Sequence, residues 1–211
     1  LQLVLKNKGE IESKEDWTKQ VLTTPIYQHT RVVTRFLIFC ASDNTVPDNR
    51  KKGLLKRGRV GIDPLLTYNK WKDKAYFTVE HVAPKSNNGD WKEDIYTDSK
   101  IINTLGNLIL LPKKENEILG NRRWEHKRLM YCLLSSKTED EFNSLLTQSG
   151  SVGLTISKRA NEVINNAKYL SLCKSIALYD KDWSLCIIEK RTRCLAELAW
   201  DRIEKWLFSD S

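Results

Sequence analysis

The stretch that decides the fold reads Phe77-Thr-Val-Glu-His-Val-Ala-Pro84 and continues, after a polar connection, with Asn107-Leu-Ile-Leu-Leu-Pro112. Both runs are rich in β-branched, aromatic and aliphatic residues, which favour strands. Proline has no N–H for the ladder of a sheet, so each run ends at its proline. The sequence therefore predicts two short strands, over 76–82 and 107–111, with a loop between them.

Helical patterns flank the two strands on both sides. The predicted class is therefore α+β and mostly helical, with an N-terminal helical region over 1–75, a central core over 76–136 and a C-terminal helical region over 137–211. The first helix begins after Ser13 as N-cap, and Thr138 opens a capping box with Glu141. A second helix is expected after Thr24 and Pro25, with an apolar face at Ile26, Val33, Phe36, Leu37 and Cys40. The other helices are expected over 121–134, 155–176 and 182–207.

Composition restricts the partners of the chain. Its 211 residues carry a net charge of +8, with a pI of about 9.2, which favours a polyanion such as nucleic acid. No apolar run approaches the roughly 20 residues that a membrane span needs, and residues 1–30 do not resemble a signal peptide. The five cysteines include no CxxC pair, which argues against a zinc site and against a disulfide framework. Buried free thiols in a reducing cytoplasm are the expected state.

A basic segment over 50–59 follows the N-terminal helices. Glycines within it predict a mobile loop. Two interpretations stay open: a solvated run of charge, or a loop that contacts the phosphates of DNA. Its basic residues are Arg50, Lys51, Lys52, Lys56, Arg57 and Arg59.

The residues around the two strands suit phosphodiester hydrolysis. His81 can take a proton from water, since an imidazole pKa near 6.5 suits a base at neutral pH. Glu80 and Asn116 offer the oxygen ligands that Mg²⁺ prefers, although Asn116 could instead cap a helix. Asn107 is expected to hold either the strand pair or the imidazole. Neighbours on a strand point to opposite faces, so Glu80 and His81 can share one site only where the strand ends or twists.

The order of these residues resembles the HNH (ββα-metal) nuclease family. Its pattern is an acidic residue and a histidine followed by proline, a central asparagine, and a last His or Asn nine positions later. Glu80-His81, Asn107 and Asn116 match it as an H-N-N variant. Thr104-Leu-Gly-Asn-Leu-Ile-Leu-Leu and the later Asn121 and Lys127 further resemble the HNH domain at the C-terminal end of GmrSD-type restriction proteins and SspE-like phage-defence nucleases.

This resemblance implies a ββα-metal core and a Mg²⁺- or Mn²⁺-dependent DNA endonuclease of a bacterial defence system, which nicks or cleaves foreign DNA. It implies that His81 is the base, that Asn107 supports it, and that Glu80 and Asn116 bind the metal. Supporting or phosphate-binding positions would be Asn121, Arg122, Arg123 and Lys127. A nucleotide-binding module would accompany this chain on its N-terminal side. Two alternatives stay open: a catalytically silent nucleic-acid-binding module on the same scaffold, and an RNase.

Overall fold

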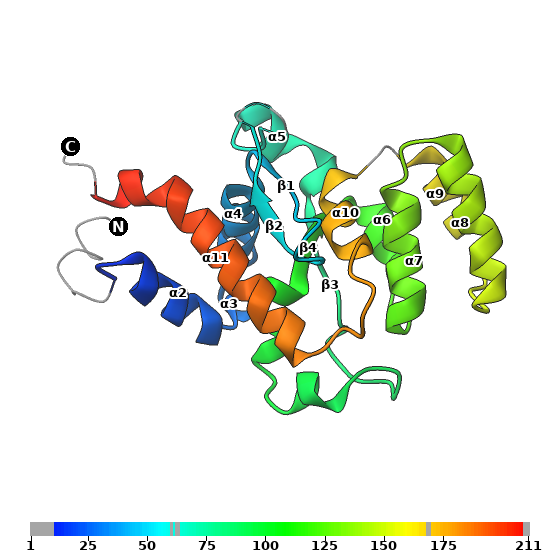
Figure 1. The fold of residues 1–211 in the computed structure, drawn as a ribbon, viewed down its shortest axis with the longest axis horizontal. Helices are drawn as coiled ribbons and strands as arrows, with labels where there is room; N and C mark the ends of the chain where they lie inside the picture. The colour runs from blue at the N-terminus through cyan, green and yellow to red at the C-terminus, as the bar shows by residue number, and fades with distance from the viewer. Residues whose placement is uncertain (1–10, 60, 62–63, 168–169, 209–211) are drawn as a thin grey trace.

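Helices make up most of the chain, and two small antiparallel sheets lie among them, so the predicted mostly helical α+β class is confirmed (Figure 1). The computed structural model describes residues 11–59, 61, 64–167 and 170–208. The elements are α2 (Lys14–Thr23), α3 (Ile26–His29), α4 (Arg31–Ser42), β1 (Thr45–Pro47), β2 (Leu55–Arg57), α5 (Tyr68–Lys72), η1 (Lys74–Tyr76), β3 (Thr78–His81), η2 (Glu93–Tyr96), η3 (Ile101–Asn103), η4 (Leu105–Asn107), β4 (Leu108–Leu111), α6 (Lys113–Leu119), α7 (Trp124–Leu134), α8 (Glu139–Ser151), α9 (Lys158–Asn166), α10 (Ser171–Ala177) and α11 (Leu185–Phe208).

Of the two N-terminal helices that the sequence predicts, only the first is observed as expected. Ser13 accepts a hydrogen bond from the N–H of Asp16 at 3.1 Å and begins α2, as predicted. The single helix expected after Pro25 is wrong, because Thr30 is extended (φ −164°, ψ 126°) and separates α3 from α4. Val33 and Phe36 were expected on the buried face, yet each is 41% exposed. The break turns α3 so that its tyrosine packs against the end of β3, while α4 packs against α11.

Part of the basic segment is a strand and not a loop. Pro47 pairs with Leu55 and Thr45 with Arg57 in the β1–β2 sheet. Gly53 takes φ +89° in the turn between the strands, a conformation that side chains rarely adopt. The expectation of a wholly mobile loop over 50–59 is therefore wrong for its second half.

The second sheet contains the two runs that end at Pro84 and Pro112. β3 and β4 are antiparallel, and the register pairs Thr78 with Leu111 and His81 with Leu108. Pro112 then starts α6, which packs against β3 and ends at Gly120 with φ +52°. The sequence predicted both strands but no helix at Lys113–Leu119. Asn116 lies inside this helix, so the alternative that it caps a helix is wrong.

The C-terminal helices are shorter or longer than expected. Thr138 caps α8 by accepting from the N–H of Glu141 at 3.2 Å, but the helix continues past Gly150 to Ser151. The helix expected over 155–176 is two helices, α9 and α10. All five cysteines are free, and Cys186 is exposed, contrary to the expectation that the thiols are buried. Among the helices in the described ranges, none has the length and apolar character that a membrane span requires.

Helix α11 fixes the segment that leads into β4. It packs against α2, α4 and η4, and Figure 1 shows it running alongside α2. Gly106 lies directly against it: a Cβ at this position would come within 2.0 Å of the Ile188 carbonyl oxygen. Arg191 donates to the Gly106 carbonyl at 2.9 Å, and the Gly106 N–H donates to the Thr192 hydroxyl at 3.0 Å. These contacts hold Asn107 at the start of β4.

Candidate active site

His81 ends β3 and is nearly buried, with 7% of its surface exposed. Its Nε2 lies 3.1 Å from Oδ1 of Asn103, and the ring of Tyr27 meets the imidazole edge-on, with centroids 4.5 Å apart. Burial lowers the pKa of His81 to about 4; the Asn103 hydrogen bond opposes this shift, and the positive charges of Lys85, Lys127 and Arg31 add to it. The imidazole is therefore neutral at pH 7.

Asn103 determines which nitrogen of the imidazole carries the proton. Its Nδ2 donates to the carbonyl of Ser99 at 3.1 Å, which fixes the amide with Oδ1 toward His81. An amide oxygen only accepts, so Nε2 of His81 carries the hydrogen, and Nδ1 keeps the free lone pair. The ring thus has the tautomer that a base requires.

Asn107 is fully buried and holds the backbone at the end of β3. Its Oδ1 accepts from the Ala83 N–H at 2.9 Å and from Nε1 of Trp183 at 3.1 Å. Its Nδ2 donates to the carbonyls of Ala83 and Ile102, each at 2.9 Å. Of the two expectations for Asn107, the contacts match the one in which it holds the strand pair. The imidazole takes Asn103 as its partner instead.

Glu80 is paired with Lys127 of α7. Nζ of Lys127 lies 2.6 Å from Oε1 of Glu80, 2.7 Å from the His81 carbonyl and 3.0 Å from the Val82 carbonyl. These three oxygens satisfy the three N–H groups of an ammonium. Burial raises the pKa of Glu80 and lowers the pKa of Lys127, while their mutual attraction opposes both shifts. The Lys127 side chain is only 1% exposed, so it supports the strand end and does not face a phosphate in solvent.

Asn116 lies on the same face of β3 as Glu80. Its Nδ2 donates to the Thr78 hydroxyl at 2.9 Å, and side chains two apart on a strand share a face. The partners of His81 come from α3 and η3 instead. The structure therefore brings Glu80, Asn116 and Lys127 together on one face and places His81, Tyr27 and Asn103 in a separate group.

The donor set on the Glu80 face suits a hard cation. In the described part of the chain, Oδ1 of Asn116 accepts no hydrogen bond, and the side chain of Lys127 bonds Oε1 of Glu80 but not Oε2. A carboxylate and an amide oxygen are ligands that Mg²⁺ accepts, and Mg²⁺ keeps waters in its other positions. The described residues contain no group of three or more His, Cys, Asp or Glu side chains that could hold a metal. The described residues of this face therefore offer two candidate ligands, the Glu80 carboxylate and the Asn116 amide oxygen.

A cavity of about 540 Å³ lies next to the side chains that contact His81, although His81 itself is not one of its lining residues. Tyr27 and Asn103, the two side chains in contact with His81, line it together with Arg31 and Lys85. The Arg31 guanidinium lies 5.4 Å and the Lys85 ammonium 4.9 Å from the centre of the Tyr27 ring. Both cations are exposed, and neither forms an ion pair with any described residue. Two exposed cations in a cavity that adjoins the neighbours of a neutral histidine suit a phosphate group.

The sequence analysis missed the residues of this cavity. Arg31 and Tyr27 belong to α4 and α3, so no spacing relates them to His81 along the chain. Asn103 had a signal, since it lies four residues before Asn107 at the start of the second apolar segment. Only the fold shows that its amide meets the imidazole.

The remaining predicted residues lie away from His81. Arg123 donates to the Val152 carbonyl at 2.9 Å and pairs with Glu125 at 3.0 Å. Arg122 donates to the Leu119 carbonyl at 3.4 Å, and the backbone carbonyl of Asn121 accepts from Asn88 at 3.1 Å. They form the connection between α6 and α7. Arg57 of the basic segment donates hydrogen bonds to the carbonyls of Asp43 and Leu198 and pairs with the carboxylate of Asp201. No described residue of 50–59 lines the cavity next to the His81 group.

A neutral buried histidine with exposed cations beside it, and a carboxylate–amide pair on the adjoining residue, define a candidate site for phosphodiester chemistry. The chain belongs to the family of GmrSD restriction endonucleases, C-terminal domain, whose model matches residues 11–198. That family places it with nucleases of the restriction type. No curated protein matches the chain.

Proposed function

We propose that this chain is an HNH-type endonuclease domain that nicks or cleaves foreign DNA in bacterial defence and depends on Mg²⁺ or Mn²⁺. The observation that carries the proposal is the His81–Asn103 contact, because it leaves Nδ1 of a neutral imidazole free to accept a proton. The family match and the net charge of +8 support DNA as the substrate.

In this proposal His81 takes a proton from the water that attacks the scissile phosphorus. A phosphate held at Arg31 and Lys85 brings negative charge next to the imidazole. Negative charge favours the imidazolium, so the pKa of His81 rises when substrate binds. The low pKa in the free protein keeps the imidazole unprotonated, and the phosphate restores its strength as a base.

Glu80 and Asn116 would hold the divalent ion; because they lie on the face of β3 opposite His81, the ion would have to reach the phosphate past the end of the strand, where it would neutralise charge on the phosphate and the leaving oxygen. Lys127 holds the carboxylate of Glu80 in place from the protein side. Asn107 fixes the backbone next to His81 through its bonds to Ala83. Each supporting residue therefore acts on the end of β3, where Glu80 and His81 are adjacent.

A supercoiled-plasmid assay tests the proposal. The parent and His81→Gln are compared with Mg²⁺, with Mn²⁺ and with EDTA. The control is His126→Ala, at a histidine of α7 whose Nε2 lies 3.1 Å from the Val152 carbonyl and which has no contact with the His81 group in the described residues. Gln retains a polar side chain at the buried position, and thermal melting shows whether it folds. We expect metal-dependent relaxed or linear product from the parent and from His126→Ala, and a rate lower by about 10² to 10⁴ for His81→Gln. Equal rates for all three folded proteins would remove His81 from the reaction.

One observation favours a second function, a silent nucleic-acid-binding module. The His81 imidazole is 7% exposed and the Glu80 carboxylate is already compensated by Lys127, which is the state expected of a scaffold that does no chemistry. This alternative predicts DNA binding that weakens steeply with salt and no product with either metal.

A further inference from the structure

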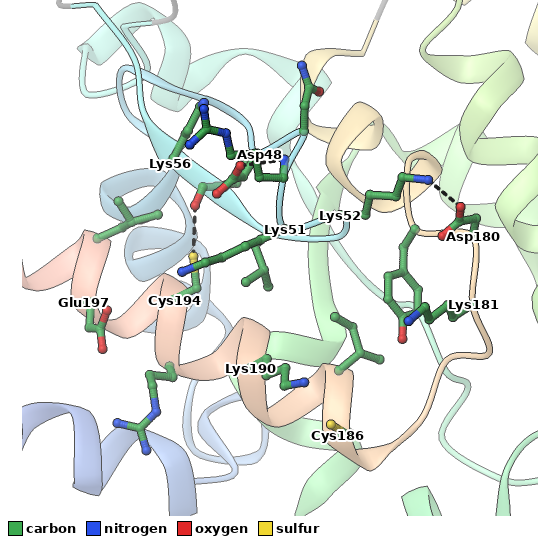
Figure 2. Close-up of a pocket in the computed structure, with 18 of the residues that line it drawn as sticks. Asp48, Lys51, Lys52, Lys56, Asp180, Lys181, Cys186, Lys190, Cys194 and Glu197 are labelled. Atoms are coloured by element: carbon green, nitrogen blue, oxygen red, sulfur yellow. Dashed lines mark hydrogen bonds and ion pairs between the residues drawn. The ribbon is translucent and has the colours of Figure 1, made fainter.

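A large cleft lies apart from the His81 cavity, between the β1–β2 sheet and α11. Its volume is about 1130 Å³, and residues 179–181 lie at one end of it (Figure 2). Leu54, Leu55, Ile187 and Tyr179 supply apolar lining. It shares no lining residue with the cavity beside His81.

The cleft carries an excess of positive charge. Eight of its lining residues are Lys or Arg and four are Asp or Glu. Two ion pairs use part of this charge, Lys52 with Asp180 and Lys14 with Asp201. Six cations form no ion pair with any residue in the described ranges, and all six are exposed: Arg50, Lys51, Lys56, Lys181, Lys190 and Arg193.

The two walls of the cleft are fixed to each other. Arg191 of α11 donates to the carbonyl of Gly53 in the β1–β2 turn. Sγ of Cys194 lies 3.1 Å from the Leu55 carbonyl, and a Cβ at Gly53 would meet Tyr179 at 3.0 Å. The cations on both walls are therefore held in proximity before any ligand arrives, and a polyanion would relieve their mutual repulsion.

We propose that this cleft binds the phosphates of a single strand of nucleic acid, at a distance from the bond that is cut. Lys190 and Arg193 lie three residues apart on α11, and Lys51 projects toward that helix from the other wall (Figure 2). Exposed cations along an open cleft, with Tyr179 and aliphatic side chains in its lining, suit a backbone with bases attached. An acidic peptide would match the cations but would leave the aromatic surface without a stacking partner.

The proposal that the cleft binds a single strand of nucleic acid rests on the proposed nuclease function in one respect only, the choice of DNA as the nucleic acid. Binding of a fluorescent single-stranded DNA oligonucleotide is measured in EDTA, which stops metal-dependent cutting, over a range of salt concentrations. Lys190→Ala/Arg193→Ala is compared with Lys19→Ala/Lys158→Ala, a control that removes the same charge from exposed positions outside the cleft. All the changed side chains are exposed, so the fold is retained, and thermal melting verifies it.

We expect the cleft variant to bind more weakly and to lower the slope of log K against log salt by about 0.7 for each phosphate that is no longer neutralised, or roughly 1.4 for the two substitutions together. The control should match the parent within error. Equal binding by the cleft variant and the control would overturn the proposal. Weaker binding of duplex DNA with unchanged binding of the single strand, or ATP that binds the cleft as tightly as the oligonucleotide, would overturn it also.

The experiments can refute the proposal for the cleft and the proposal for the active site independently of each other. A protein that binds through the cleft but yields no product with any metal would retain this inference and lose the proposed function. A protein that cuts plasmid with unchanged affinity in the cleft variant would retain the function and lose the cleft.

Discussion

Replacing Lys127 with methionine tests whether the buried ion pair determines the state of the Glu80 carboxylate. Methionine is similar in length and removes only the ammonium. Glu80 then keeps its buried position, with its side chain 12% exposed, but has no counter-charge. The carbonyls of His81 and Val82 lose their donor in the same step. Breaking a buried pair from one side costs about 3–5 kcal/mol, so we expect a loss of that size at pH 8.

The loss should depend on pH in a defined direction. Lys127 is the largest contribution that lowers the pKa of Glu80 against the effect of burial, so its removal raises the pKa of that carboxyl further. A carboxyl with a raised pKa in the folded state contributes full stability below its unfolded pKa, which is about 4.3, and loses it as pH rises through the folded value. The stability that Lys127→Met loses relative to the parent should therefore be smallest at pH 4, where the carbonyls without a donor still contribute, and largest at pH 8.

Urea unfolding followed by tryptophan fluorescence measures both effects, and the double variant Glu80→Leu/Lys127→Met is the control. Without the carboxylate, the part of the pH dependence that Glu80 contributes should vanish, and a large part of the stability should return, since apolar replacements of buried pairs are often neutral. Two carbonyls without a donor would account for the remainder. A loss below about 1 kcal/mol that is equal at pH 4 and pH 8 would refute the reasoning.

Three further predictions concern the contacts around the strand end. Activity should fall as pH drops toward 4, because protonation of His81 removes the base. Asn103→Asp should move this acidic limb of the pH–rate profile to higher pH, since an added negative charge favours the imidazolium. Asn103→Ala should lower the rate in the plasmid assay roughly tenfold and leave binding of DNA in EDTA unchanged. Gly106→Ala should destabilise by at least about 1–3 kcal/mol in urea, because its Cβ meets the backbone of α11, whereas Gly150→Ala, whose Cβ meets no described atom within 4 Å, should not destabilise.

The elements with a local signal were predictable. The two strands between their prolines, Ser13 as the cap of α2 and Thr138 as the cap of α8 depend on neighbours in sequence, and they were identified. The elements that depend on distant packing were not. Thr30 interrupts a good helical pattern because Tyr27 packs on His81, and no sequence pattern within 24–40 indicates that contact.

The residues of the candidate site likewise form two groups, those that a local sequence pattern predicts and those that only packing brings together. Residue types and spacing within 77–131 pointed to Glu80, His81, Asn107 and Asn116, and their roles in a reaction stay predictions. Asn103 contacts the imidazole, and Arg31 and Lys85 line the neighbouring cavity, only after α3, α4 and η3 have packed near the end of β3. The basic segment was recognised by composition, but composition could not show that Arg57 is committed to α11 while Lys51 and Lys56 face a cleft.

Lys127 and Asn107 explain how adjacent side chains on opposite faces can be held with precision. Lys127 bonds the carboxylate of Glu80 and the carbonyls of the next two residues, and Asn107 takes both the N–H and the carbonyl of Ala83. Four consecutive residues are therefore fixed by two buried side chains from other elements. A buried ion pair adds little net stability compared with apolar residues of similar size, so stability alone does not account for a lysine at this position. A lysine at position 127 is explained if the protein must hold the Glu80 carboxylate on one face of β3 while His81 keeps its tautomer on the other face.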